Sequence, residues 1–186
     1  PVPVCGINMG TLGFMADIEQ NELESRLESI CAGDYHIEWR RFLAGFVTKP
    51  DGAEHFLGLA INDIVVMKGD PARIISLGLA VNATPLVECK ADGFIVASPT
   101  GSTAYSLSAG GPIMNPMVKG IVLTPICPHT LNIRPLIIRE EDVVHIHLVD
   151  TRQSIIVTLD GQETTPIHPD DIVTVKSSDV RAGIIK

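Results

Sequence analysis

The sequence predicts a mostly β protein: an antiparallel β-sandwich-like domain that follows the last strand and helix of an α/β domain. The chain has 16 glycines and 13 prolines among 186 residues, so turn residues recur at short intervals. The segments between them are rich in valine and isoleucine, which favour strands. Asp160-Gly161, between Leu159 and Gln162, is typical of a two-residue hairpin turn.

One strand and one helix are predicted in residues 1–33, which we assign to the remnant of an amino-terminal α/β domain. The apolar strand Val2–Ile7 leads into a glycine-containing loop. Asn21 is expected to cap the helix, with Glu24 three residues later, and Gly33 is expected to end it. The predicted apolar face of this helix consists of Leu23, Leu27, Ile30 and Cys31.

Residues 34–186 are predicted to form the all-β domain. About nine segments have the valine and isoleucine content and the flanking turns of strands. They are 35–49, 55–68, 72–82, 91–98, 120–126, 134–139, 143–149, 154–159 and 171–176.

The composition excludes several classes of protein. Hydrophobic residues make up 45% of the chain and charged residues 19%, which argues against intrinsic disorder. The net charge of -8 provides no basic surface for nucleic acid. No apolar run reaches the roughly 18 residues that a membrane span needs. We therefore expect neither a nucleic-acid partner nor a membrane.

The cysteines and the start of the chain indicate a cytoplasmic protein. The four cysteines are widely scattered and form no zinc-ligand pattern, so free thiols in a reducing compartment are expected. The start, Pro1 to Val4, has neither an initiator methionine nor the positive region of a signal peptide. This suggests a chain cut from something longer.

The segment from Asp92 to Pro112 is the densest chemical feature. Six of the nine residues from Thr100 to Ser108 carry hydroxyl groups. Pro99 discourages a helix at Ser98, and Ser102 is expected to cap a short helix that Gly110-Gly111-Pro112 ends. These hydroxyls could simply satisfy a turn and a cap, but their number favours a binding loop for a ribose, a phosphate or a base edge. It is not a Walker A loop, because no lysine follows the glycine.

Asn62-Asp63 lies inside a segment that is otherwise apolar. Two adjacent polar side chains in a strand need partners if they are buried. Either one of them faces solvent on the outer side of the sheet, or both lie near a ligand, with Asp63 accepting hydrogen bonds from hydroxyls.

The histidines give weaker signals. Cys127 and His129, separated by Pro128, do not form a convincing dyad. His145 and His147 would share one face of a strand, but no third metal ligand lies nearby in the sequence, which favours an ordinary strand face. No nucleophile elbow or zinc pattern is present. The residues alone therefore predict a binding surface without an evident catalyst.

The sequence resembles the NAD kinase family. Residues 98–112, Ser-Pro-Thr-Gly-Ser-Thr-Ala-Tyr-Ser-Leu-Ser-Ala-Gly-Gly-Pro, closely match the signature loop of that family. The resemblance extends over essentially the whole chain and is of the bacterial type. Other segments that match in order and spacing are Gly6-Ile7-Asn8, Gly10, Leu12-Gly13-Phe14, Asn62-Asp63, Asp92-Gly93, Leu123 to His129, Arg134-Pro135 and Asp160-Gly161-Gln162.

The resemblance implies phosphorylation of NAD at the 2′-hydroxyl of its adenosine ribose, which gives NADP. It implies ATP as phosphate donor, or inorganic polyphosphate in some members, and a divalent metal such as Mg²⁺. It also implies self-association into a homodimer or homotetramer.

The resemblance implies NAD-binding roles for ten residues and no metal ligand. Asn62 and Asp63 match a motif that contacts the dinucleotide. The loop that holds the adenosine part is matched by Thr100, Thr103, Ala104 and Tyr105. Asp92 and Ser108 match residues that reach the nicotinamide riboside, often across a subunit boundary. Cys127 and Gly161 match positions in the wall of the ligand site.

The family's catalytic motif, Gly-Gly-Asp-Gly-Thr, lies upstream of the segment that matches Gly6-Ile7-Asn8. The sequence therefore predicts no catalytic residue in this chain and an inactive chain on its own, because phosphoryl transfer depends on positioning the donor phosphates. The alternatives are a non-catalytic dinucleotide-binding or sensor module, and a related lipid kinase of the diacylglycerol type. The intact Pro-Thr-Gly-Ser-Thr-Ala-Tyr loop argues against the lipid kinase.

Overall fold

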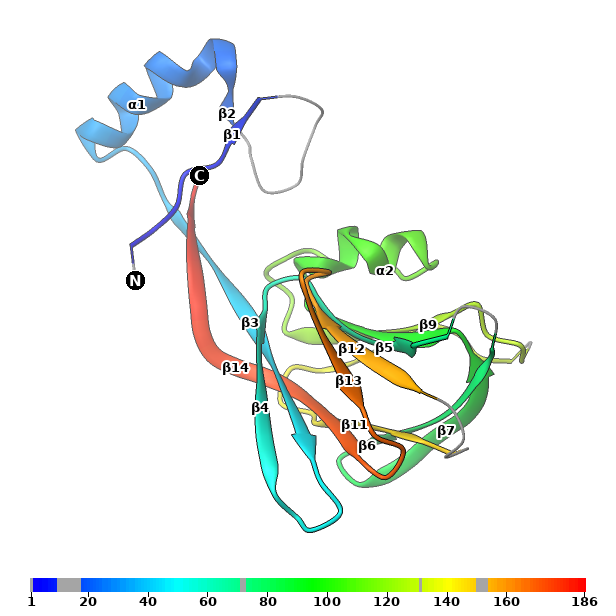
Figure 1. Ribbon diagram of the computed structural model, residues 1–186. Helices are drawn as coiled ribbons and strands as arrows, with labels where there is room; N and C mark the ends of the chain where they lie inside the picture. The colour runs from blue at the N-terminus through cyan, green and yellow to red at the C-terminus, as the bar shows by residue number, and fades with distance from the viewer. Residues whose placement is uncertain (1, 10–17, 71–72, 131, 150–153) are drawn as a thin grey trace. The chain divides into compact units, whose positions relative to one another are not determined.

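The computed structural model describes residues 2–9, 18–70, 73–130, 132–149 and 154–186. The chain divides into two compact units, shown in Figure 1, and each is described by itself. The smaller unit contains residues 1–41 and 180–186, and the larger one contains Phe42–Asp179. No helix in the described residues is long and apolar enough to cross a membrane.

The smaller unit contains a short parallel strand pair and a helix. Strand β1 (Ile7–Asn8) pairs with β2 (Ile18–Glu19), and the chain continues through the 3-10 turn η1 (Gln20–Glu22) into α1 (Leu23–Ala32). Gly33 ends the helix with a left-handed φ of 82°, which glycine adopts without steric cost. The predicted helix and its end at Gly33 are therefore confirmed.

Two details of the predicted amino-terminal elements are wrong. Asn21 does not cap α1, because it lies inside the preceding 3-10 turn, and the N-cap residue Glu22 makes no side-chain cap hydrogen bond. The segment Val2–Ile7 is not a continuous strand, since only Val4 forms an isolated bridge, with Ile184, before β1 begins. The predictions for Gly10, Gly13 and Leu12–Phe14 fall outside the described residues.

Twelve strands form two six-stranded sheets. The first sheet has the order β10-β9-β8-β5-β12-β13 and the second has the order β4-β3-β14-β11-β6-β7. Nine strand pairings within the two sheets are antiparallel: β10–β9, β9–β8, β8–β5, β5–β12, β12–β13, β4–β3, β14–β11, β11–β6 and β6–β7. In chain order the strands are β3 (Ile37–Thr48), β4 (Glu54–Ala60), β5 (Asp63–Lys68), β6 (Ile75–Val81), β7 (Thr84–Ala91), β8 (Gly93–Ala97), β9 (Gly120–Ile126), β10 (Leu136–Arg139), β11 (Val144–Leu148), β12 (Ile155–Leu159), β13 (Glu163–Ile167) and β14 (Ile172–Ile185).

The main core lies between the two sheets, because it draws buried side chains from both. Ile64 and Val96 come from the first sheet, and Leu77 and Ile146 come from the second. This arrangement confirms the predicted antiparallel, sandwich-like fold.

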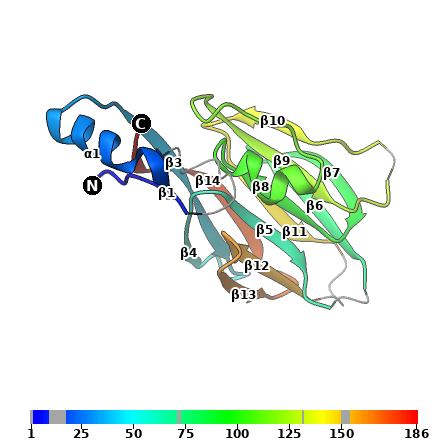
Figure 2. The same cartoon turned by 90° about the horizontal axis from the view of Figure 1, so that it is seen from above.

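A second cluster covers the opposite face of β5, β8 and β9. It contains Val65, Ile95 and Val122, and it is covered by Met114 and Ala109 from the segment around α2 (Tyr105–Ser108). Figures 1 and 2 show α2 over this sheet. The central strands of the first sheet are therefore buried on both faces, which explains why β8 and β9 are continuously apolar.

The predicted strand over residues 55–68 is wrong. The chain forms two strands, β4 and β5, which belong to different sheets and are separated by a bend at Ile61 and Asn62. Two further strands, β7 and β13, were absent from the predicted set, and β14 continues nine residues beyond the predicted end at Lys176 to Ile185. The alternation of charged and apolar residues in Thr84–Ala91 reflects a strand with one solvent-facing side.

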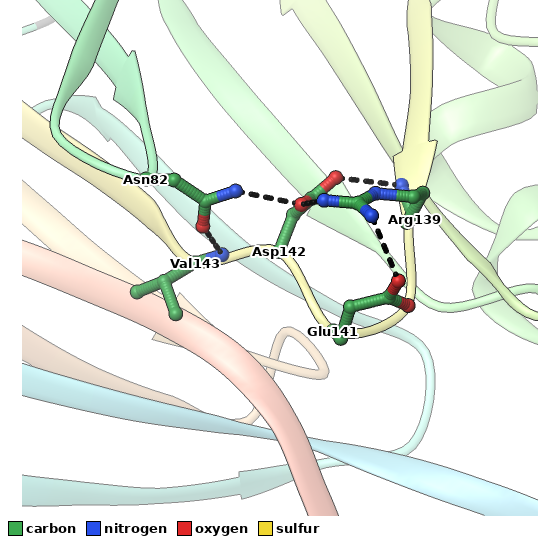
Figure 3. Close-up of polar contacts among 5 residues, drawn as sticks. All are labelled: Asn82, Arg139, Glu141, Asp142 and Val143. Atoms are coloured by element: carbon green, nitrogen blue, oxygen red, sulfur yellow. Dashed lines mark hydrogen bonds and ion pairs between the residues drawn. The ribbon is translucent and has the colours of Figure 1, made fainter.

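A polar network joins the two sheets at the β10–β11 connection (Figure 3). Asn82, in the β6–β7 turn, donates its amide to the Asp142 carboxylate (2.7 Å) and accepts from the Val143 amide (2.9 Å). Asp142 also accepts from the Arg139 guanidinium (2.9 Å) and the Arg139 amide (2.9 Å). The hydrogen bonds from Arg139 and Asn82 hold the pKa of Asp142 below its usual range.

We expect Asn82→Ala to lower the free energy of unfolding by about 2 kcal/mol, because two hydrogen bonds are lost, one of them to a charged group. Urea denaturation measures this. Asn82 has a φ of 49°, so Asn82→Gly is the matched control: it loses the same bonds but relieves the left-handed backbone. If Asn82→Ala were as stable as the wild type, the hydrogen bonds would contribute nothing.

Candidate functional site

The bend at Ile61–Asp63, between β4 and β5, is held by a residue from another part of the chain. The Asp160 carboxylate accepts hydrogen bonds from the backbone amides of Ile61 (2.8 Å), Asn62 (2.8 Å) and Asp63 (3.0 Å). The Asp160 amide donates to the Asp63 carbonyl (3.0 Å). Asp160 and Gly161 lie in the β12–β13 turn with φ values of 49° and 68°, so the predicted hairpin is confirmed. Its loop has three residues, 160–162, and not the predicted two, because Leu159 pairs with Glu163.

The hydroxyl-rich segment is attached to the same bend. The Ser98 hydroxyl donates to the Ile61 carbonyl (2.5 Å) and accepts from the Gly101 amide (3.1 Å), while the Ser98 amide donates to the Asn62 carbonyl (2.8 Å). Gly101 lies directly against the Asn62 backbone, since a Cβ there would be 1.9 Å from the Asn62 carbonyl oxygen. The bend and the loop therefore form one unit with Asn62 between them.

Ser102 and Ser106 of this segment are buried and have structural roles. Ser102 donates to the Pro99 carbonyl (2.6 Å) and accepts from the Met114 amide (2.9 Å), and it does not cap α2 as the sequence suggested, because it lies in the 3-10 turn η2 (Gly101–Thr103). Ser106 bonds to Thr124 (2.8 Å) on β9, and both are fully buried. Of the two alternatives for the hydroxyls of this segment, the structural one, in which they satisfy the backbone of a turn, is correct for these two serines.

A second set of residues on the same segment is less buried. Tyr105 and Ser108 are exposed, and Thr103 and Ala104 are half-buried. Thr100 is nearly buried, and its carbonyl accepts a hydrogen bond from the Thr103 hydroxyl (3.2 Å). The segment thus divides into inner serines that fix the backbone and outer side chains that are available to a ligand.

Electrostatic interactions link Tyr105 to three acidic groups from different elements. Burial raises the pKa of the Tyr105 phenol, and the neighbouring Cys127, Asp92 and Asp63 raise it further. Asp63 begins β5, Asp92 lies between β7 and β8, and Cys127 follows β9 with a left-handed φ of 44°. The fold therefore gathers four of the predicted site residues that are far apart in the sequence.

Asp63 is an unusual carboxyl group. It is only 4% exposed, and its pKa is raised from 3.8 to about 6, first by burial and then by the nearby Asp160 carboxylate. Of the two interpretations of Asn62-Asp63, the structure excludes a solvated Asp63 on the outer face. A buried carboxyl group that titrates near neutral pH is typical of a functional site.

The sequence alone did not indicate two residues of this site. Asp160 was predicted as part of a hairpin turn and of a segment that matches the family, but it was given no role in the site. Lys68, at the end of β5, forms an ion pair with Asp92 (2.8 Å), and both side chains are half-buried. Neither partner could be found from local pattern, because 24 residues separate Lys68 from Asp92 and 97 residues separate Asp63 from Asp160.

The remaining candidates have structural surroundings. Gly161 is exposed in the turn beside Asp160. His145 bonds to Thr174 (3.0 Å), and the His147 ring packs on the backbone at Gly78. Across the described ranges of the chain, no group of three His, Cys, Asp or Glu side chains is placed to hold a metal ion.

Comparison with protein families identifies the larger part of the chain. Residues 61–186 match the model of the ATP-NAD kinase C-terminal domain. The chain is 44% identical over 185 residues to an NAD kinase of Heliobacterium modesticaldum and 42% identical over 184 residues to one of Moorella thermoacetica. The matches include 100% and 99% of this chain but only 65% and 58% of the two relatives, so the chain spans about three fifths of their length.

Solved structures agree with this result. The chain superimposes on yeast NADH kinase complexed with NADH with a TM-score of 0.85 and 32% identity, over 98% of this chain and 53% of that one. An NAD kinase from Archaeoglobus fulgidus in complex with ATP gives a TM-score of 0.81 and 29% identity, over 99% of this chain and 68% of that one. These matches confirm the resemblance inferred from the signature loop: the chain belongs to the NAD kinase family.

Proposed function

We propose that the whole protein is an NAD kinase, which transfers the terminal phosphate of ATP, or of polyphosphate, to the 2′-hydroxyl of the adenosine ribose of NAD and so produces NADP. The observation that carries this proposal is the grouping of Asp63, Asp92 and Cys127 around Tyr105, beside the hydroxyl-rich loop. The relatives named NAD kinase, and the solved relatives complexed with NADH and with ATP, support the same ligands.

The described residues suit the binding of a dinucleotide without a basic surface. A ribose hydroxyl donates readily to a carboxylate, and the ionised Asp63 is placed to accept such bonds, with Asn62 beside it. The Tyr105 ring is 39% exposed and offers a face for an adenine base. Asp92 and Ser108 are proposed to reach the nicotinamide riboside, and the adenosine part and the ligand wall are assigned to Thr100, Thr103, Ala104, Cys127 and Gly161.

Within this chain the site supplies binding and orientation. Phosphoryl transfer depends mainly on positioning and on electrostatic stabilisation of the phosphates. Holding the acceptor ribose between the bend and α2 would provide the positioning. Mg²⁺ is normally held by one or two carboxylates together with substrate phosphates. Asp92 is engaged by Lys68 and Asp63 is largely buried, so we assign neither as a metal ligand and derive no step through the metal.

The two other functions have less support. A lipid kinase is not favoured, because the named relatives and structural neighbours are NAD or NADH kinases. A non-catalytic dinucleotide-binding module is disfavoured by the same relatives. Self-association into a homodimer or homotetramer and a cytoplasmic location stay predictions.

The test is an assay of the whole protein with NAD, ATP and Mg²⁺, in which NADP is measured by an NADP-specific dehydrogenase. NADP formation that requires ATP is the expected result. Binding of NAD in calorimetry without any NADP, with ATP or with polyphosphate, would favour the non-catalytic module instead.

We expect Tyr105→Ala to weaken NAD binding by the whole protein about tenfold, because a stacking platform worth about 1–3 kcal/mol is removed. Isothermal titration calorimetry measures the dissociation constant. Leu107→Ala is the matched control, since Leu107 lies on the same helix and is 38% exposed, close to the 39% of Tyr105. Equal affinity in the Tyr105 variant and the control would contradict the assignment of Tyr105.

A further inference from the structure

The Asp160 side chain contacts the backbone of every residue in the Ile61–Asp63 bend. Its two carboxylate oxygens accept three consecutive amide hydrogens at 2.8, 2.8 and 3.0 Å. Hydrogen bonds to a charged acceptor are stronger than neutral ones. Asn62 belongs to no strand, and Asp63 begins β5, where it pairs with Ala97. The Asp160 carboxylate, together with Ser98, therefore holds the backbone from which the two side chains leave the bend.

The position of Asp160 is itself determined by the fold. It is the first residue of the three-residue β12–β13 loop and has a left-handed φ of 49°, a conformation that aspartate tolerates better than most residues. Leu159 pairs with Ile64 across β12 and β5, so the turn lies next to the bend. The Asp160 amide also donates a hydrogen bond to the Asp63 carbonyl (3.0 Å), so the two residues are joined by hydrogen bonds in both directions.

We propose that Asp160 is a positioning residue of the nucleotide site: its carboxylate holds the three backbone amides of the Ile61–Asp63 bend and so places the Asn62 and Asp63 side chains for the ligand. This inference rests on the proposed function. Asp160 does not itself need to touch NAD, because it acts on Asn62 through the backbone and on Asp63 through both the backbone and its charge.

The surroundings of Asp63 give the sign of the pH effect. Asp160 acts on it from the β12–β13 turn and Tyr105 interacts with it from α2. Asp92 and Cys127 interact with Tyr105, and Lys68 is paired with Asp92. Burial and the Asp160 charge both raise the pKa of Asp63, to about 6. NAD affinity should therefore decrease as the pH falls through about 6. Removing the Asp160 charge should move this decrease to lower pH.

The experiment measures NAD binding by the whole protein in calorimetry between pH 5 and pH 8, for the wild type and three variants. Asp160→Asn keeps the shape but loses the charge and one acceptor. We expect its dissociation constant for NAD at pH 8 to rise about tenfold, because small displacements of positioning groups have effects of this size. We also expect the acid limb, which is the decrease of NAD affinity at low pH, to move to lower pH. Asp160→Glu keeps the charge but displaces it, so its affinity should decrease while its acid limb stays near pH 6.

Asp170→Asn is the matched control, because the same change is made at an exposed aspartate in the next turn. It should bind NAD like the wild type at every pH. Unchanged affinity and an unchanged acid limb in Asp160→Asn would overturn the proposal. If melting curves show that Asp160→Asn does not fold, wild-type affinity in Asp160→Glu would overturn it equally. A wild type that binds no NAD would instead refute the proposed function.

Discussion

Gly101→Ala is expected to abolish NAD binding and to lower the free energy of unfolding by about 3 kcal/mol or more. The added Cβ would lie 1.9 Å from the Asn62 carbonyl oxygen, 2.3 Å from the carbonyl carbon and 2.6 Å from the Asn62 Cα. All three are backbone atoms, so no rotation of a side chain relieves the overlap. The loop and the bend must separate, and the hydrogen bonds of Ser98 to this bend are then strained or lost.

Urea denaturation and calorimetry with NAD measure these two effects. Gly110→Ala is the matched control in the same segment, because a Cβ at Gly110 would meet no atom within 4 Å while its φ of 88° disfavours alanine. It should cost only about 1–2 kcal/mol, the usual cost of a left-handed residue with a side chain. If the two variants were equally stable, contact with Asn62 would not be the reason for glycine at position 101.

Local sequence pattern was sufficient to predict those elements whose conformation depends on their own residues or on burial along their whole length. Strand β9 was predicted at its observed bounds, 120–126, because all seven of its residues are buried and all of them except Thr124 are apolar. The hairpin at Asp160-Gly161 and the helix end at Gly33 depend on left-handed backbone, which few residue types adopt.

Prediction failed where a distant contact decides the local conformation. Residues 55–68 look like one strand, but three amides at its centre bond to Asp160, about a hundred residues later, and the chain changes sheets there. The helix begins at Leu23 because the chain enters it through a 3-10 turn directly after β2. Neither cause is visible in a short window of sequence.

The candidate site was predictable as a segment but not as a set of contacts. The hydroxyl pattern located the loop at 98–112, yet only the structure separates the inner Ser98, Ser102 and Ser106 from the outer Tyr105 and Ser108. A cap motif and a binding motif use the same residue types, so composition cannot distinguish them. Burial of each hydroxyl is the property that does.

Asp63→Asn is expected to stabilise the fold while it weakens NAD binding. The pKa of Asp63 is about 6 in the folded protein against 3.8 for the unperturbed group, so the folded state binds its proton more tightly than the unfolded chain does. Between pH 4 and pH 6 stability must therefore decrease as the pH rises. Above pH 6 the ionised carboxylate costs about 3 kcal/mol, which follows from this difference in pKa.

Asparagine has the shape of aspartate without the charge, so the variant should gain up to about 3 kcal/mol at pH 8 and nothing near pH 4. Urea denaturation at both pH values measures this. Asp170→Asn, at an exposed aspartate, is the control, and it should leave the free energy of unfolding unchanged at both pH values. A gain that does not depend on pH would mean that packing, and not the buried charge, limits stability here. A gain in stability together with a loss of NAD affinity would indicate that Asp63 is kept ionised for its ligand at the expense of the fold.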